Sequence, residues 1–404
     1  MTRQYRADLT WMKYHVGCAA MLFGHNGPVI IIAGGGIGGL TLGCALSRAR
    51  IPFRIFERAA ELRPLGAGIA LSSNAFQALA YIGIEDQVLE CGWELAVAEI
   101  CDSHGRVLIR VQMRDFAAGG SRAMTRADLQ QTLLGALGAK VETGRAVVGY
   151  QSTDARVRVR MADGDKVDAE LLVGADGLHS AVRRAMRGDE PLRYSGQTSW
   201  RGLVAGLEID EPHRVRESWG PGTRFGFVPV GVNHVYWFAV ANAPAGERDA
   251  ADPCRELRVR FAGWHPPIDQ LLANTPREQI IRTDIFDRPP INCWVDGRTV
   301  LLGDAAHPMT PNMGMGACQA IEDAVVLADA LAREPSVDAA LARYQTRRIS
   351  RANSFVTRSF RFGQLAHLRI APLRWLRDRA LRSFRLVPRS LVSRVTARDF
   401  EFQL

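Results

Sequence analysis

Apolar runs in three separate parts of the chain end at a glycine or an acidic residue, and each leads into a helical pattern. They span residues 28–33, 170–174 and 299–302, and a fourth run at 52–56 ends at Glu57. Short uninterrupted apolar runs are typical of strands buried in a parallel sheet, and apolar positions three or four residues apart after them indicate amphipathic helices. The pattern therefore predicts an α/β fold built on a parallel sheet.

A different pattern fills the middle of the chain. Residues 194–207, 224–230 and 234–241 are rich in aromatic and β-branched residues and are separated by turns, which predicts an antiparallel sheet. Side chains two positions apart share a face of such a sheet, so Tyr236 and Trp237 are expected on opposite faces. Further predicted elements are a hairpin of 97–102 with 107–111, short helices at 254–261 and 267–272, and a strand at 280–286.

These patterns divide the chain into four parts. A loosely ordered extension is expected at 1–27, which has no clear periodicity and is a poor signal peptide. A discontinuous cofactor-binding domain is expected at 28–190 and 280–350. It encloses a mainly β substrate domain at 191–279, and basic helices follow at 351–404.

The loop after the first strand contains Gly-x-Gly-x-x-Gly at Gly34, Gly36 and Gly39. The first glycine permits a tight turn, the second lets the backbone approach a pyrophosphate, and the third lets helix and strand pack closely. Glu57 ends the next strand about 20 residues further on, where an acid binds ribose hydroxyls. The unit predicts a dinucleotide site without separating FAD from NAD. Arg58 either contacts a 2′-phosphate or is solvated.

Two more acidic residues follow predicted strands. Asp176-Gly177 comes after the strand at 170–174, where the carboxylate either serves a cofactor or merely caps the next helix. Gly303-Asp304 comes after the third strand, and a helical pattern begins near Gly316. A helix start presents unpaired N–H groups and partial positive charge, which suit an anion or a carbonyl-rich ring. An acid beside it can accept hydrogen bonds from the hydroxyls of a sugar or a ribityl chain.

The three motifs in this order resemble the group A flavoprotein monooxygenases, which are single-component FAD hydroxylases with the para-hydroxybenzoate hydroxylase fold. The sequence that begins at Gly303, Gly-Asp-Ala-Ala-His-Pro-Met-Thr-Pro-Asn, is most similar to that of the subgroup of zeaxanthin epoxidase, urate hydroxylase and salicylate hydroxylase-type enzymes. Met315 departs from this pattern, because the subgroup usually has Gln at that position. The resemblance covers roughly residues 28–365. It implies a Rossmann-like FAD-binding domain of the GR2 type, an interleaved antiparallel-sheet substrate domain and C-terminal helices.

The resemblance also implies a chemistry and a set of site residues. FAD would be bound, NADPH or NADH would reduce it, and O2 would add to form a C4a-hydroperoxide that hydroxylates an aromatic or heteroaromatic small molecule. The loop of Pro308, Pro311 and Gly314 is expected beside the flavin ring. The expected cofactor-binding residues are Gly34, Gly36, Gly38, Gly39, Glu57, Arg58, Gly68, Arg126, Asp176, Gly177, Gly303, Asp304, Gly314, Met315 and Gly316.

Substrate contacts are expected from the antiparallel sheet. The candidates are Arg201, Phe227, Tyr236 and Trp237, any of which could instead belong to the core of that sheet. No nucleotide-binding glycine motif other than the one at 34–39 is present for NAD(P)H, which argues against disulfide reductases and Baeyer–Villiger enzymes with two such units.

Composition adds limits to this hypothesis. The seven cysteines and nine histidines show no spacing typical of a disulfide framework or a metal site, so a reducing cytoplasm is expected. The net charge of +9 is concentrated near the end, where residues 347–399 hold fourteen arginines and only two acidic residues. These helices either lie on an anionic membrane surface or pack on the protein with solvated arginines, and we favour packing. No nucleic-acid motif is present, and a monomer or homodimer is expected.

Three other functions remain open at this level. The protein could be an FAD-dependent epoxidase of an isoprenoid or other lipophilic olefin, for which a basic, apolar C-terminus would be useful at a membrane. It could also bind FAD without catalysis, or be a colourless NAD dehydrogenase. Substrate-stimulated NAD(P)H oxidation by a yellow protein would distinguish the first from the other two.

Overall fold

The computed structural model describes residues 29–62, 68–115, 120–153, 155–249, 252–384, 387, 398–402 and 404. The predicted extension at 1–27 lies outside the described residues, as does much of the chain beyond 384.

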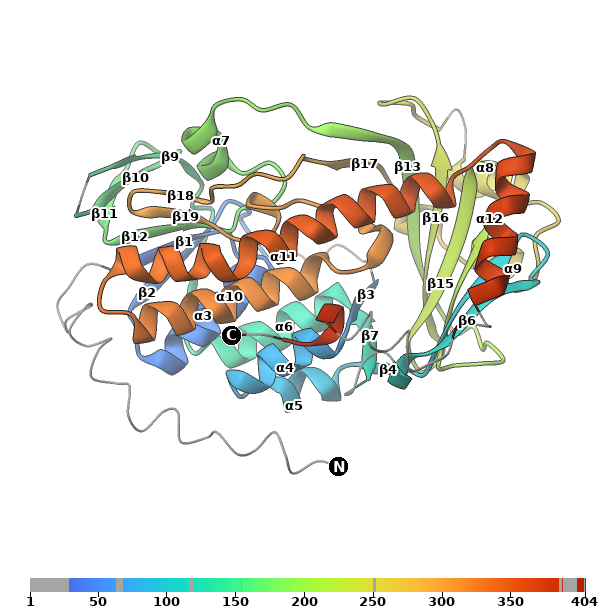
Figure 1. Ribbon diagram of the computed structural model, residues 1–404, viewed down its shortest axis with the longest axis horizontal. Coiled ribbons are helices and arrows are strands. Elements are labelled where there is room, and N and C mark those ends of the chain that lie inside the picture. The colour runs from blue at the N-terminus through green and yellow to red at the C-terminus, as the bar shows by residue number, and fades with distance from the viewer. Residues whose placement is uncertain are drawn as a thin grey trace.

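A six-stranded sheet in the order β18-β19-β12-β1-β2-β8 forms the centre of one half of the molecule (Figure 1). All of its pairings are parallel except that of β18 with β19. Ala33 pairs with Gly174 and Gly174 pairs with Leu301, so the ends of β1, β12 and β19 lie side by side. The three predicted motifs therefore leave the same edge of this sheet. The strands are β1 (Ile30–Ala33), β2 (Phe53–Glu57), β8 (Val141–Thr143), β12 (Leu171–Gly174), β18 (Val295–Asp296) and β19 (Thr299–Leu301).

Helices cover one face of this sheet, and a small antiparallel sheet with α7 covers the other (Figure 1). The apolar strands Ile30–Ala33 and Leu171–Gly174 are buried throughout because both faces are covered. The helices on this half are α3 (Ile37–Ala49), α4 (Ser73–Tyr81), α5 (Glu85–Glu90), α6 (Arg126–Leu137), α7 (Ala181–Arg187) and α10 (Gly316–Arg333). The small sheet is formed by β9 (Val147–Ser152), β10 (Val157–Met161) and β11 (Lys166–Ala169).

A seven-stranded sheet in the order β17-β13-β16-β15-β14-β5-β6 forms the other half. The predicted hairpin of β5 and β6 is present, and it joins this sheet through a parallel pairing of β5 with β14. The central strands are long and antiparallel, as their aromatic and β-branched residues predicted. The strands are β5 (Val97–Asp102), β6 (Val107–Gln112), β13 (Arg193–Ala205), β14 (Arg214–Trp219), β15 (Thr223–Gly231), β16 (His234–Asn242) and β17 (Ile281–Asp287).

Two short helices, α8 (Pro253–Arg260) and α9 (Ile268–Ala273), pack on one face of the seven-stranded sheet. Its other face meets a three-stranded sheet of β3 (Gly68–Leu71), β4 (Trp93–Leu95) and β7 (Ser121–Thr125). This sheet of β3, β4 and β7 thereby connects the two halves.

The long helix α11 (Val337–Ala366) runs past both halves, and α12 (Ala371–Ser383) follows at the far end of the seven-stranded sheet (Figure 1). Ser336 caps α11 by accepting a hydrogen bond from Ala339 N. None of the helices in the described part of the chain is both long and apolar enough to span a bilayer.

Candidate active site

The glycine loop between β1 and α3 packs against neighbouring backbone at Gly34 and Gly39 but has open space at Gly36. Gly34 has φ +114°, and a Cβ there would lie 2.3 Å from the Ala175 carbonyl oxygen. A Cβ at Gly39 would lie 2.0 Å from the Gly34 carbonyl oxygen, whereas at Gly36 it would meet nothing within 4 Å. Gly36 also precedes α3 without a side-chain cap. The bare backbone at this helix start therefore fits a phosphate group.

Glu57 reaches this loop from the end of β2. Its carboxylate accepts hydrogen bonds from Gly35 N at 2.8 Å and from Ala59 N at 2.9 Å. Gln130 Nε2 donates to the Gly35 carbonyl oxygen at 3.3 Å, which brings α6 to the same loop. Arg58 is exposed beside Glu57.

Gly38 has a packing role in the structure, and its contact with a cofactor stays a prediction. A Cβ at this position would lie 2.6 Å from the Leu302 side chain and 3.3 Å from the Ala320 Cβ. The glycine therefore lets α3 approach α10 closely, because the space that a side chain at this position would need is filled by protein.

Asp304 lies in a recess at the start of α10. Its side chain is reached by solvent, yet the surrounding protein raises the pKa of its carboxyl through desolvation, an effect that nearby Asp323 adds to and that His307 and Arg126 oppose. Asp304 Oδ1 lies 4.0 Å from the position of a Cβ on Gly316. Asp304, the first residue of α10 and the Arg126 cation at the start of α6 are therefore neighbours, although they are distant in sequence.

Gly303 and Gly314 flank this recess in left-handed conformations, with φ values of +60° and +65°. Pro308 is buried and Pro311 is exposed on the loop between them. The side chain of Met315 is 4% exposed and belongs to the core, so only its backbone can face a ligand. Because α10 begins after Met315 without a side-chain cap, its first N–H groups are available to a cofactor.

Asp176 is engaged with α7 through its carboxylate, and its contact with a cofactor stays a prediction. Its carboxylate accepts hydrogen bonds from the Ser180 hydroxyl, from Ala181 N at 2.7 Å and from Val182 N at 3.3 Å. Burial raises the pKa of this carboxyl. The Asp176 Cα nevertheless lies 3.0 Å from the position of a Cβ on Gly34, so the turn with Gly177 supports the glycine loop from behind.

The structure separates the four predicted substrate residues into two pairs on opposite faces of the seven-stranded sheet. Phe227 and Trp237 pair across strands and belong to the core that α8 and α9 complete, where Trp237 Nε1 donates to Thr275 Oγ1 at 2.8 Å. Their prediction as substrate contacts is wrong because they point away from the cofactor-binding half. Arg201 and Tyr236 point toward it.

Tyr236 lies directly over the strand that carries Gly68. A Cβ on Gly68 would lie 2.4 Å from the tyrosine ring, so only glycine allows this approach. Burial raises the pKa of Tyr236 to about 12, and the Arg201 cation opposes that rise. Arg201 donates to Thr283 Oγ1, and its buried Nε has no hydrogen-bond partner among the residues that the structure describes. An unpartnered buried donor next to a phenol is suited to a polar substrate atom.

Three apolar side chains on this face are absent from the sequence prediction. Leu203 and Val228 pack beside Tyr236, and the Phe238 ring centroid lies 6.3 Å from that of Tyr236. The period-two alternation that separates Tyr236 from Trp237 also places Phe238 with Tyr236, so this signal was available in the sequence.

A buried ionic network behind the recess is a second set that sequence reasoning missed. Asp323 Oδ2 lies 2.5 Å from His307 Nε2 and accepts from Gly303 N at 3.0 Å, while its Oδ1 accepts from Arg348 Nε at 2.6 Å. Glu322 binds the same arginine and also Arg351. Acidic residues at 322–323 within an apolar helical run were the sequence signal for buried charge. The network ties the Asp304 loop to α10 and α11.

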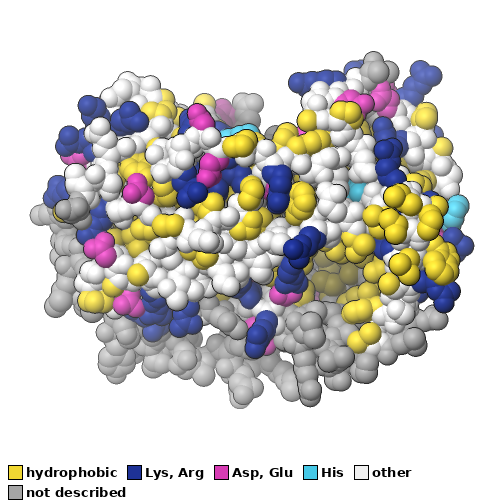
Figure 2. All heavy atoms as spheres, turned by 45° about the horizontal axis from the view of Figure 1, so that its top comes forward, with side chains coloured by type: hydrophobic (Ala, Val, Ile, Leu, Met, Phe, Trp, Pro, Cys, Tyr) yellow, Lys and Arg dark blue, Asp and Glu magenta, His cyan; other side chains and the backbone are white. Residues whose placement is uncertain are grey.

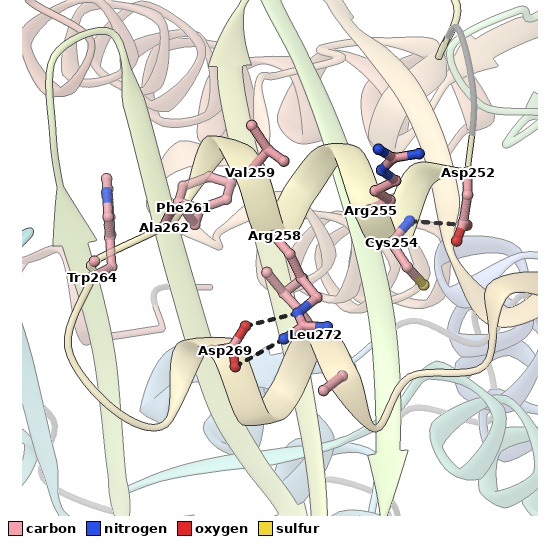
Figure 3. Close-up of a pocket in the computed structure, with 12 residues that line it drawn as sticks. Asp252, Cys254, Arg255, Arg258, Val259, Phe261, Ala262, Trp264, Asp269 and Leu272 are labelled. Carbon is pink, nitrogen blue, oxygen red and sulfur yellow. Dashed lines mark hydrogen bonds and ion pairs between the residues drawn. The ribbon is translucent and has the colours of Figure 1, made fainter.

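The hollow in Figure 3 lies elsewhere, on the outer side of α8 and α9. It has a volume of about 610 Å³ and contains the ion pair of Arg258 with Asp269. Phe261 and Leu272, which pack on the sheet face that carries Trp237, contribute to its wall. None of the predicted site residues lines it.

The arrangement defines a dinucleotide-binding half whose recess faces an antiparallel sheet that carries the phenol of Tyr236 and the cations of Arg201 and Arg224. Its residues fit FAD: open backbone at Gly36 for phosphate, uncapped starts of α3 and α10, and an accessible acid at Asp304. Comparison with known proteins agrees with this class. A protein-family profile described as "FAD binding domain" matches residues 27–359, so the chain belongs to the FAD-binding-domain family.

Individual relatives cover nearly the whole chain. It is 47% identical over 381 residues to aurachin C monooxygenase/isomerase of Stigmatella aurantiaca, covering 93% of this chain and 99% of the relative. It is 33% identical over 384 residues to 2-heptyl-3-hydroxy-4(1H)-quinolone synthase of Pseudomonas aeruginosa, covering 92% and 97%. Klebsiella pneumoniae HpxO complexed with FAD and uric acid superposes with a TM-score of 0.84 at 29% identity, covering 93% and 98%. The predicted fold class, FAD cofactor and monooxygenase class are confirmed.

Proposed function

We propose that this FAD-dependent monooxygenase uses NAD(P)H and O2 to hydroxylate a heteroaromatic ring that carries an apolar chain, with 2-alkyl-4(1H)-quinolones as the leading class. The observation that carries this proposal is the 47% identity with a monooxygenase of aurachin C over 93% of the chain. The quinolone synthase covers 92% of the chain at 33% identity, and the product that its name gives combines a planar ring, a carbonyl and a heptyl chain.

In this proposal the domain of residues 28–190 and 280–350 holds FAD. Bound FAD would accept electrons from NAD(P)H and deliver one oxygen atom of O2 to the substrate. Gly34 permits the tight turn and Gly36 lets the backbone approach the diphosphate. Glu57 binds the ribose and Asp304 binds the ribityl hydroxyls. The start of α10 at Gly316 stabilises negative charge on the flavin ring, a contribution of about 0.3–2 kcal/mol.

The seven-stranded sheet would bind the substrate through its inward face, on the strands that residues 191–279 supply. Burial raises the pKa of Tyr236 to about 12, so its hydroxyl remains a proton donor at neutral pH. Together with the Arg201 cation it can hold the carbonyl oxygen of a quinolone or the oxyanion of its enol form. Leu203, Val228 and Phe238 offer apolar contacts to the ring and chain and exclude water from the reaction.

A substrate panel tests this proposal directly. We expect 2-heptyl-4(1H)-quinolone to stimulate NADH or NADPH oxidation by the flavin-loaded protein and to yield a product heavier by one oxygen atom. Urate and salicylate serve as comparison substrates. Strong stimulation by urate with none by the quinolone would contradict the substrate class while leaving the monooxygenase class intact.

Placement of the flavin ring beside Gly314 has its own test. Gly314→Asp puts a carboxylate where the electron-rich edge of the ring is expected, so the purified protein should lose its yellow flavin. Gly138→Asp is a matched control because Gly138 has the same φ of +65° and equally open space around its Cβ position. A fully loaded Gly314→Asp protein would refute the placement.

A further inference from the structure

The C-terminal helix α12 presents an apolar face that the described part of the chain does not cover. Trp375 is 61% exposed, Leu376 59% and Leu373 45%, and Ile370 just before the helix is 60% exposed. Figure 2 shows hydrophobic side chains gathered at the end of the molecule where Figure 1 places α12. Isolated exposed apolar residues are ordinary, but a contiguous group on one helix marks an interaction surface.

The opposite side of α12 is firmly docked, so the orientation of this face is set by the fold. Arg377 is 6% exposed and donates to the carbonyl oxygens of Leu365 and Ala366 at the end of α11, at 3.3 and 3.0 Å. Its guanidinium lies 4.9 Å from the ring centroid of buried Trp219. The exposed apolar side chains therefore cannot reach the core by a small rotation of the helix.

Exposed arginines lie on the same helix as the apolar side chains. Residues 365–384 contain five arginines and one acidic residue, Asp378, whose carboxylate accepts from Arg377 Nε at 2.9 Å. Arg379 and Arg382 are exposed, and the Arg379 guanidinium lies 5.1 Å from the Trp375 ring centroid. A face that combines Trp, Leu and Ile with exposed arginines has the chemistry of a helix lying in the interface of an anionic bilayer.

We propose that α12 docks this enzyme peripherally on an anionic lipid surface, with Trp375 and Leu376 entering the interface and Arg379 meeting lipid phosphates. Charge complementarity favours this occupant over a second copy of the chain. A two-fold symmetric contact through this face would set arginines of one copy against those of the other. The docking rests on the exposed face alone and does not depend on the identity of the substrate.

Vesicle co-sedimentation of the full-length, flavin-loaded protein tests the proposal. We expect binding to vesicles of equal parts phosphatidylglycerol and phosphatidylcholine, weak binding to phosphatidylcholine alone, and a loss of binding as salt rises. The Trp375→Ser/Leu376→Asp variant should bind at least about tenfold more weakly, because each large apolar side chain contributes about a factor of ten. Arg379→Gln should weaken binding about fivefold, the effect of one arginine near an anionic surface.

A matched control separates this face from general surface hydrophobicity. Val148 on β9 is 42% exposed at the opposite end of the molecule, so Val148→Asp should bind vesicles as the unchanged protein does. Flavin content and thermal stability show that each variant is folded. The proposal is overturned if the unchanged protein stays in solution with anionic vesicles, or if the Trp375→Ser/Leu376→Asp variant still binds them fully. It is equally overturned if these substitutions abolish a dimer seen by sedimentation equilibrium without affecting vesicle binding.

Discussion

Asp323→Asn should weaken both folding and FAD binding, because one buried carboxylate holds α10, α11 and the Asp304 loop together. Asp323 is fully buried, and its oxygens contact His307, Arg348 and the backbone N–H of Gly303. The amide keeps the shape of the side chain but removes the charge that His307 and Arg348 share. The loop from Gly303 to His307 then loses its link to α10.

The size of the effect follows from the pKa of Asp323. Burial raises it, but His307 and Arg348 outweigh burial and lower it from 3.8 to about 2. At about 1.4 kcal/mol per pKa unit, the ionised carboxylate contributes roughly 2 kcal/mol to stability. This stability is present above pH 3.8 and is lost as the pH falls toward 2. Because the substitution also leaves Arg348 partly unpaired in the core, we expect a total loss of about 3–5 kcal/mol near neutral pH.

Denaturant unfolding of the apoprotein and titration with FAD measure the two effects separately. Asp329→Asn is the matched control, because Asp329 lies on the same helix, is 2% exposed and pairs with Arg333 and Arg343 away from the recess. Both variants should be less stable, but only Asp323→Asn should bind FAD about tenfold more weakly, the equivalent of ~1.4 kcal/mol. The reasoning is refuted if Asp323→Asn unfolds within 1 kcal/mol of the unchanged protein, or if both variants lose FAD affinity equally.

Three further outcomes are expected. Gly34→Ala should prevent stable folding, since its Cβ would overlap a backbone carbonyl, whereas Gly36→Ala should fold and lose flavin content on purification. Burial lowers the pKa of His367 to about 3, so this histidine stays neutral in the folded protein, whereas in the unfolded chain it titrates near 6.5. The stability that neutral His367 contributes is therefore complete above pH 6.5 and declines as the pH falls below 6.5. His367→Gln should reduce the slope of melting temperature against pH between pH 3 and pH 6.5. Tyr236→Phe should lower substrate-stimulated NAD(P)H oxidation with little change in stability. Trp237 lies in the core against α8 and α9, so Trp237→Phe should lower the free energy of unfolding by about 1–3 kcal/mol and leave turnover per folded molecule unchanged.

Local patterns were sufficient for the strands that carry the three motifs and for the edge at which these strands meet. The apolar runs that end at Ala33, Gly174 and Leu301 became neighbouring strands, and parallel strands in register necessarily bring their following loops together. Alternation with period two also separated Tyr236 from Trp237 correctly, because adjacent side chains of a strand point to opposite faces.

Alternation could not say which of those faces meets the cofactor-binding half. Trp237 and Phe227 were as plausible as Tyr236 until the packing of α8 and α9 was known, since both faces of the sheet carry aromatic residues. Asp176 likewise had two possible partners, and only the position of α7 shows that its carboxylate caps that helix. A sequence specifies which direction a side chain takes from its own backbone, whereas its partner comes from another part of the chain.

The same distinction explains the buried charges. Glu322 and Asp323 are recognisable as acids within an apolar helix, but their stability depends on Arg348 and His307, which α11 and the Asp304 loop bring to them. Ionised groups can be buried only where partners converge in three dimensions. Residue type and periodicity thus determined the motif-bearing strands, the long antiparallel strands and the glycine turns of this protein. Long-range packing decided which polar groups face the cofactor recess and which hold it in place.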